Sequence, residues 1–105
     1  MEQMLNTKLI AFHGKKEIKE KYLNRVIAHR KADEIVKGIY WQNGKGCAVG
    51  CTIEFGDNSK VHKKFEEELG IPEDVAKIED WLFENLSNGE AKKFPEQFLQ
   101  AVPIG

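Results

Sequence analysis

The stretch VHKKFEEELGIPEDV, residues 61–75, carries the clearest fold signal in this chain of 105 residues. Val61, Phe65 and Leu69 recur at helical spacing, and the residues between them are mostly charged. The glycine after Leu69 suits the end of a helix because glycine readily adopts the left-handed conformation, while Pro72 suits the first turn of the next helix. The stretch therefore predicts two helices with a break between them.

The same periodicity extends to both sides of this stretch and predicts an all-α domain. The expected elements are a helix from about Lys15 to Lys37 that ends at Gly38, a helix capped by Asn58 or Ser59 that ends at Gly70, a helix from Pro72 to near Asn88–Gly89, and a short amphipathic segment after Pro95. We expect their apolar stripes to form the core, from Ile18, Tyr22, Val26, Val61, Phe65, Leu69, Val75, Ile78, Leu82 and Phe98.

Residues 38–55 fit two different local structures. Residues 39–41, Ile-Tyr-Trp, favour a strand, and Asn43-Gly44 is a strong signal for a hairpin turn. However, two strands alone are marginally stable, and residues 47–51 would also fit a short buried helix. We favour a loop that leads into a short helix, with one short β-hairpin as the alternative.

Composition indicates one small globular domain, residues 1–105, in the cytoplasm. Hydrophobic residues make up 41% of the chain and charged residues 31%, which is ordinary for a folded domain. The net charge of -1 provides no global attraction to nucleic acid or to an anionic membrane. No apolar stretch approaches the roughly 18 residues of a membrane span. Two cysteines, Cys47 and Cys51, do not form the framework of a disulfide-rich secreted domain, so we expect them to stay unbridged.

The most unusual segment is GKGCAVGC, residues 44–51, which combines three glycines with two thiols. It is not a phosphate-binding P-loop, because Lys45 is followed by Gly46 instead of serine or threonine. It lacks the strand–helix–strand context of a dinucleotide-binding turn, and its cysteines lack the two-residue spacing of a haem or zinc motif. The simplest interpretation is a tightly packed turn and helix with two buried structural cysteines.

Two classes of function stay open. One is a binding or interaction domain in which the glycine- and cysteine-rich segment shapes a pocket. The other is a cysteine- or metal-dependent enzyme, since a thiolate at a glycine-rich helix start would be stabilised by backbone N–H groups and a histidine could act as its base. No catalytic residue, cofactor or metal site is assigned. The candidate ligand-binding residues are Gly46, Cys47, Gly50, Cys51, His29 and His62.

Several short segments also support a family resemblance. They are His13-Gly14, Lys21-Tyr22-Leu23, Ala28-His29-Arg30, Ala32-Asp33-Glu34, the run Gly46-Cys47-Ala48-Val49-Gly50-Cys51-Thr52, the run Glu67-Glu68-Leu69-Gly70-Ile71-Pro72, and Pro95-Glu96-Gln97-Phe98-Leu99. Together they resemble a family of uncharacterised bacterial proteins, and the resemblance covers residues 11–105. The resemblance implies a bacterial, cytoplasmic setting, but it carries no activity, cofactor, partner or residue role to this chain.

The chain ends on an apolar sequence, residues 102–105, Val-Pro-Ile-Gly. Members of the family that it resembles extend beyond this ending, which predicts that the chain is a fragment or a short version. An apolar terminus also makes the C-terminus a candidate surface for homo-oligomerisation. Beyond this candidate, no partner is assigned.

Overall fold

The computed structural model describes residues 9–57 and 59–105, and it shows a small, mostly helical domain. The described elements are the 3₁₀ turn η2 (Ala11–Gly14), α1 (Lys16–Lys31), β1 (Trp41–Gln42), β2 (Lys45–Gly46), α2 (Ala48–Ile53), α3 (Val61–Leu69), α4 (Glu73–Glu84) and α5 (Asn88–Ala101). The predicted fold class is therefore confirmed. None of the helices in these two ranges is both long and apolar enough to cross a membrane.

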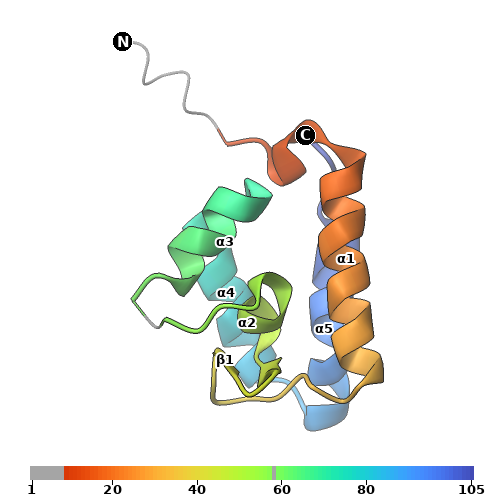
Figure 1. Cartoon of the computed structure of the whole chain (residues 1–105), viewed down its shortest axis with the longest axis vertical. Coiled ribbons are helices and arrows are strands. Elements are labelled where there is room, and N and C mark those ends of the chain that lie inside the picture. Colours follow the sequence, from red (N-terminus) through yellow and green to blue (C-terminus); the bar gives the residue numbers. More distant parts are fainter. Residues whose placement is uncertain (1–8, 58) are drawn as a thin grey trace.

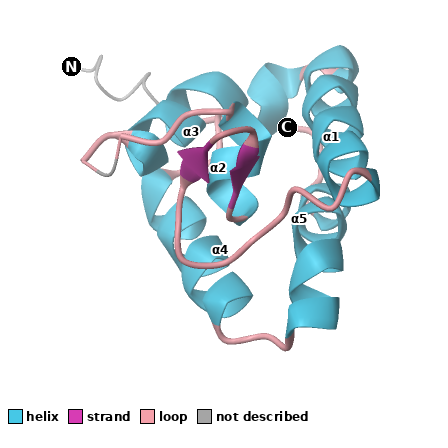
Figure 2. Ribbon diagram, turned by 60° about the horizontal axis from the view of Figure 1, so that its bottom comes forward, coloured by secondary structure: helices cyan, strands magenta, loops and turns pink. Residues whose placement is uncertain are grey.

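The helices form two pairs on either side of a short central helix (Figure 1). The long helices α1 and α5 run side by side in opposite directions, and α3 packs on α4. Helix α2 lies between the pairs and contacts all four of these helices. The two-strand hairpin β1–β2 lies beside α2 (Figure 2). Because α2 is buried on every side, both of its faces contribute to the core.

The helix break predicted at Gly70 is confirmed. Gly70 adopts the left-handed conformation, with a φ of +71°, after the last residue of α3. The three predicted core residues of α3 are fully buried. Of the other core residues expected in α1, α4 and α5, Tyr22 and Val26 are buried, and Ile18, Val75 and Phe98 are partly buried against them.

The predicted cap of α3 is not what the structure has. Asn58 lies outside the described residues, and Ser59 hydrogen-bonds to the side chain of Asp57 instead of capping the helix. Lys60 occupies the N-cap position, where its side chain makes no capping hydrogen bond. Ser59 is therefore part of the turn that begins at Asp57, and its hydroxyl is not available to cap α3.

The predicted first helix is six residues too long, since α1 ends at Lys31 and not at Lys37. Asp33 turns the chain out of the helix with a left-handed φ of +58°, a conformation that aspartate tolerates better than most residues. Ile35 then pairs with Gly46 in a parallel bridge, so the apolar residues after Lys31 pack on the hairpin. Gly38 consequently plays no part in ending the helix.

Residues 38–55 contain both the β-hairpin and the short helix that the sequence analysis considered. Asn43 and Gly44, with φ values of +55° and +78°, make the tight turn between β1 and β2, and α2 follows directly. The preference for a loop over a hairpin was therefore wrong. The backbone N–H of Cys47 extends the hairpin by donating to the carbonyl of Ile39 at 2.9 Å, and the N–H of Val36 ties it to the preceding segment by donating to the carbonyl of Gly46 at 2.8 Å.

The last two helices begin and end elsewhere than expected. Helix α4 stops at Glu84, and the Asn88–Gly89 segment begins α5 instead of ending α4. Ser87 caps α5 by accepting from the N–H of Glu90 while its hydroxyl donates to the Glu90 carboxylate, a side-chain cap that the sequence analysis missed. Pro95 lies inside α5, where it is buried, and does not precede a separate segment.

The face that α4 presents to the core also differs from the prediction. Ile78 and Leu82, expected in the core, are exposed, while Glu79 and Asp80 are buried. The buried apolar residues of this helix are Ala76 and Phe83. In this orientation Asp80 hydrogen-bonds to Cys47, Val49 and His62 inside the domain.

Candidate functional site

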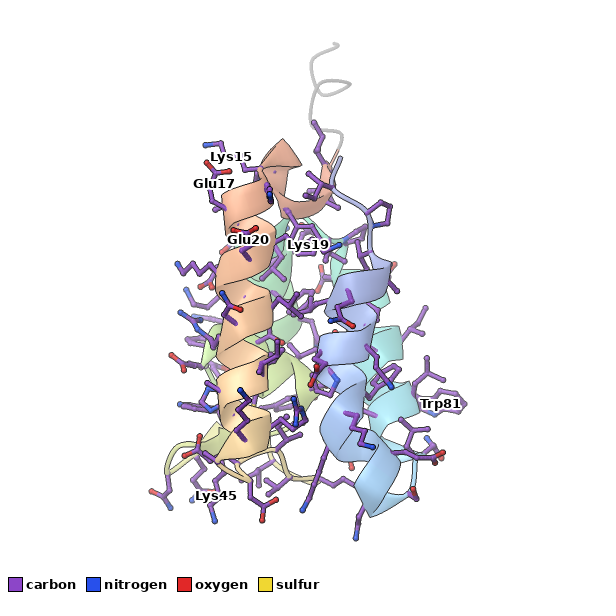
Figure 3. All side chains as sticks on the ribbon, turned by 90° about the vertical axis from the view of Figure 1, so that its right-hand side faces the viewer. Lys15, Glu17, Lys19, Glu20, Lys45 and Trp81 are labelled. Carbon is purple, nitrogen blue, oxygen red and sulfur yellow. The ribbon has the colours of Figure 1, made fainter. Side chains whose placement is uncertain are left out.

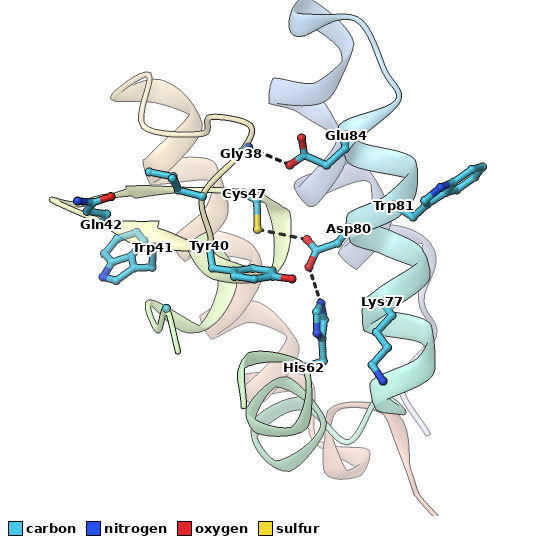
Figure 4. A pocket seen from close by; sticks show the side chains of 12 residues that line it. Gly38, Tyr40, Trp41, Gln42, Cys47, His62, Lys77, Asp80, Trp81 and Glu84 are labelled. Carbon is cyan, nitrogen blue, oxygen red and sulfur yellow. Dashed lines mark hydrogen bonds and ion pairs between the residues drawn. The ribbon is translucent and has the colours of Figure 1, made fainter. Parts of the chain in front are cut away.

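A pocket of about 660 Å³ lies between the hairpin and α4 (Figure 4). One wall is formed by residues 38–42, which lead into and form β1. Cys47 lies at the start of α2, and His62 comes from the first turn of α3. The opposite wall is one face of α4, with Lys77, Asp80, Trp81 and Glu84. The pocket thus joins segments that are distant in the sequence.

Close packing of three glycines fixes the wall formed by Tyr40 and Trp41. A Cβ atom on Gly50 would lie 1.4 Å from the carbonyl oxygen of Tyr40, and one on Gly46 would lie 2.0 Å from the same oxygen. A Cβ atom on Gly56 would lie 2.5 Å from the carbonyl oxygen of Trp41. The backbone at residues 40–41 therefore occupies the space that side chains would need. The glycines of this region set the position of the wall.

Asp80 links three elements at the base of the pocket. Its Oδ1 accepts from the Cys47 thiol at 3.2 Å and from the Val49 N–H at 3.3 Å. Its Oδ2 accepts from Nε2 of His62 at 2.6 Å. The carboxylate thereby satisfies a backbone N–H in the first turn of α2 and ties α3 to α4. Removing Asp80 would leave buried donors without a partner.

Burial controls the ionisation of these groups. Burial raises the pKa of Asp80, although the hydrogen bonds from His62 and Cys47 act in the opposite direction. Burial also raises the pKa of the Cys47 thiol, and the nearby Asp80 charge raises it further. The pKa of Tyr40 is raised by burial and then by Asp80, and its ring lies edge-on to His62 with centroids 5.4 Å apart. Thiol and phenol are both neutral near neutral pH.

The order of the three groups differs from that of a nucleophilic triad. In such a triad, a histidine lies between the nucleophile and the acid, so that it can remove the nucleophile's proton. Here the Asp80 carboxylate lies between Cys47 and His62. This arrangement keeps the proton on sulfur and orients the imidazole ring. The three side chains are therefore arranged as a rigid part of the pocket wall and not as a catalytic centre.

Both cysteines are unbridged and buried, as predicted. We expect neither thiol to react with iodoacetamide in the folded protein at about pH 7.5, because a neutral, buried thiol is a poor nucleophile. Cys51 donates to the carbonyl of Gly46 at 3.2 Å, and burial raises its pKa to about 12. Intact-mass analysis after alkylation checks this. Both thiols should react when urea unfolds the chain, and rapid labelling of Cys47 in the folded protein would contradict the assignment.

The structure separates the six candidate residues into four groups. Cys47 and His62 line the pocket, whereas Gly46 and Gly50 lie behind its hairpin wall. Cys51 does not line the pocket but belongs to a buried cluster. The other members of this cluster are Ile35, Cys47, Ala48, Phe83 and Ala91.

His29 lies in a separate polar cluster on the other side of Trp41. Its Nδ1 is 2.6 Å from the Glu34 carboxylate, and its Nε2 is 2.9 Å from the Glu54 carboxylate. Trp41 packs edge-on against the His29 ring with centroids 5.2 Å apart. The two carboxylates occupy both ring nitrogens, so the cluster fixes the chain around the end of α1.

The sequence analysis missed the residues of the pocket that come from α4. Asp80, Lys77 and Glu84 were not singled out, because the predicted core stripe of this helix ran through Ile78 and Leu82. One signal could have found them: Ala76 and Phe83 are spaced by seven residues, and a face that contains both also contains Asp80.

Within residues 9–57 and 59–105, no three His, Cys, Asp or Glu side chains are grouped so that they could hold a metal ion. No family model matches the chain, and no curated protein or solved structure is significantly similar to it. Functional inference therefore depends on the pocket itself.

Proposed function

We propose that this domain binds a small organic molecule with an aromatic body in the pocket between the hairpin and α4, and that it does so without chemical conversion. The observation that carries the proposal is a pocket of about 660 Å³ in which the side chains of Cys47 and His62 are already hydrogen-bonded to Asp80. Ligand pockets of this size combine apolar and aromatic walls with a few polar groups.

The walls favour a ligand that is neutral or positively charged. Tyr40 and Trp41 provide aromatic surface on one side. His62 is paired with Asp80, and Lys77 lies 3.8 Å from the Glu73 carboxylate. Glu84 accepts one hydrogen bond, from the backbone N–H of Gly38 at 3.1 Å, and its charge is not matched by an ion pair among the described residues. A cation beside Glu84 would gain both a hydrogen bond and a favourable charge interaction.

The alternative, a cysteine- or metal-dependent enzyme, draws less support. A thiol that donates to a carboxylate and has a raised pKa is a weak nucleophile, and His62 faces Asp80. The reduced, unbridged cysteines and the resemblance to a bacterial family support a bacterial cytoplasmic setting for the binding function.

Aromatic probes of opposite charge test the proposal. We expect benzamidine to bind at least about fivefold more tightly than benzoate, because the Glu84 carboxylate in the pocket attracts the cation. Affinities can be measured by saturation-transfer NMR. Glu84→Gln should remove the preference, while Glu17→Gln, an exposed change on α1, should leave it intact. Equal affinity of both probes for wild-type protein would contradict the charge assignment, and no binding of either probe would contradict the proposed function.

A further inference from the structure

Helix α4 exposes three large apolar side chains while it buries two carboxyl groups. Ile78 is 57% exposed, Trp81 is 65% exposed and Leu82 is 40% exposed. Their spacing of three and four residues places them on one face of the helix. Figure 3 shows Trp81 extending away from the domain, and in Figure 4 its indole points away from the pocket, whose rim the residue forms. Soluble proteins seldom leave such a stripe uncovered without a partner.

The orientation of α4 is fixed by contacts inside the domain. Asp80 holds the helix through its hydrogen bonds to α2 and α3, as described above. Turning α4 to bury Ile78 and Leu82 would withdraw this carboxylate from three donors. The apolar stripe is thus a stable feature of the surface.

The charges beside the stripe are complementary to a second copy of the same stripe. Lys77 and Glu84 are separated by seven residues, two helical turns or about 10.5 Å, and lie on one side of α4, where both line the pocket. Trp81 lies close to their midpoint. If two copies pack antiparallel about a two-fold axis near Trp81, Lys77 of each copy faces Glu84 of the other. A parallel arrangement would instead bring like charges together.

We propose that the α4 faces of two copies of this chain pack antiparallel about such an axis and form a homodimer. This inference goes beyond ligand binding, and because Glu84 lines the pocket, a cationic ligand and Lys77 of the other copy compete for it. The proposal places the self-association surface on α4 instead of on the C-terminus. The C-terminal residues make contacts within their own chain: the Gly105 N–H donates to the Ala11 carbonyl, and Lys19 donates to the Val102 carbonyl.

The expected dimer is weak. A twelve-residue helix is about 18 Å long, which provides less than the roughly 800 Å² per partner of a typical stable interface. Ile39, exposed on the opposite wall of the pocket, extends the apolar area beyond α4. We therefore expect a monomer–dimer equilibrium in the micromolar range.

Sedimentation velocity on the ligand-free protein, from about 1 µM to about 300 µM, tests the proposal independently of the ligand. The wild-type protein should shift from monomer to dimer over this range. Leu82→Glu changes a residue that does not line the pocket, and it should weaken dimerisation at least about tenfold because it buries a charge. A monomer at every concentration in the wild-type protein, or a dimer that Leu82→Glu leaves unchanged, would overturn the proposal.

Charge reversal tests the antiparallel pairing. Lys77→Glu and Glu84→Lys should each weaken the dimer about tenfold, since each places like charges opposite one another twice in the symmetric contact. The double variant should restore wild-type association. Lys31→Glu changes an exposed residue at the end of α1; it is the control and should leave dimerisation unchanged. Far-UV circular dichroism checks that every variant is folded. Two single variants that weaken the dimer without rescue in the double variant would rule out this pairing.

Discussion

Gly50→Ala is expected to destabilise the domain by about 3 kcal/mol or more, a large share of the total stability of a small domain. A Cβ atom at this position would lie 1.4 Å from the carbonyl oxygen of Tyr40, so the hairpin must move away from α2. That movement would break the hydrogen bond from Cys47 to Ile39 and open the pocket wall. Urea unfolding followed by far-UV circular dichroism measures the loss.

The matched control is Gly89→Ala, the same substitution in the first turn of α5. No atom lies within 4 Å of a Cβ placed there, so alanine gains helix propensity without a clash. We expect a gain of a few tenths to about 1 kcal/mol. A Gly50→Ala protein as stable as wild type would show that the hairpin does not pack on α2 in this way.

Glu79→Leu should stabilise the domain by about 1–3 kcal/mol near neutral pH. Glu79 is fully buried, and neither of its carboxyl oxygens hydrogen-bonds to a described residue. Burial raises the pKa of this carboxyl well above its ordinary value, and the neighbouring Asp80 raises it further. Leucine has a similar volume and needs no polar partner. Thermal unfolding should show a melting temperature several degrees higher, since about 1 kcal/mol corresponds to roughly 4–8 °C in a domain of this size.

The pH dependence of this effect has a definite sign. Above the ordinary carboxyl pKa of 4.5, unfolded Glu79 loses its proton while the folded form retains it. The contribution of Glu79 to the free energy of unfolding of the wild-type protein therefore falls by about 1.4 kcal/mol per pH unit as pH rises, until the folded carboxyl also ionises. Glu79→Gln keeps the shape and polarity without titrating. The stability of Glu79→Gln relative to wild type should thus increase between pH 5 and pH 8, and a constant difference would contradict the raised pKa.

Local signals predicted α3 and the helix break correctly because each depended on nearby residues. Phe65 and Leu69 follow a helical period, and Gly70 takes the conformation that its lack of a side chain permits. The end of α1 depended instead on contacts distant in sequence. Ile35 continues the apolar period of the helix, but its bridge to Gly46 gives it a better place beside the hairpin. Periodicity alone cannot weigh those two options.

The same limit explains the incomplete prediction of the pocket. Cys47 and His62 were singled out by residue type, and both line the pocket. Asp80 was overlooked because its importance comes from burial and from donors on other elements, whereas its own helix carries a more apolar stripe around Ile78. Apolar pattern predicts the buried face of a helix only when no polar network or partner chain competes for it.

Backbone amide NMR shifts during a benzamidine titration test the binding function most directly. The account predicts saturable shifts at the pocket walls, at Gly38, Tyr40 and Gly56 and on α4 at Glu84, with the indole N–H of Trp41. Gly89 and the residues of α1, which lie outside the pocket, should change little. Saturable shifts centred on any other surface, or no shift at the pocket up to about 10 mM benzamidine, would contradict the proposal that this pocket is the site of function.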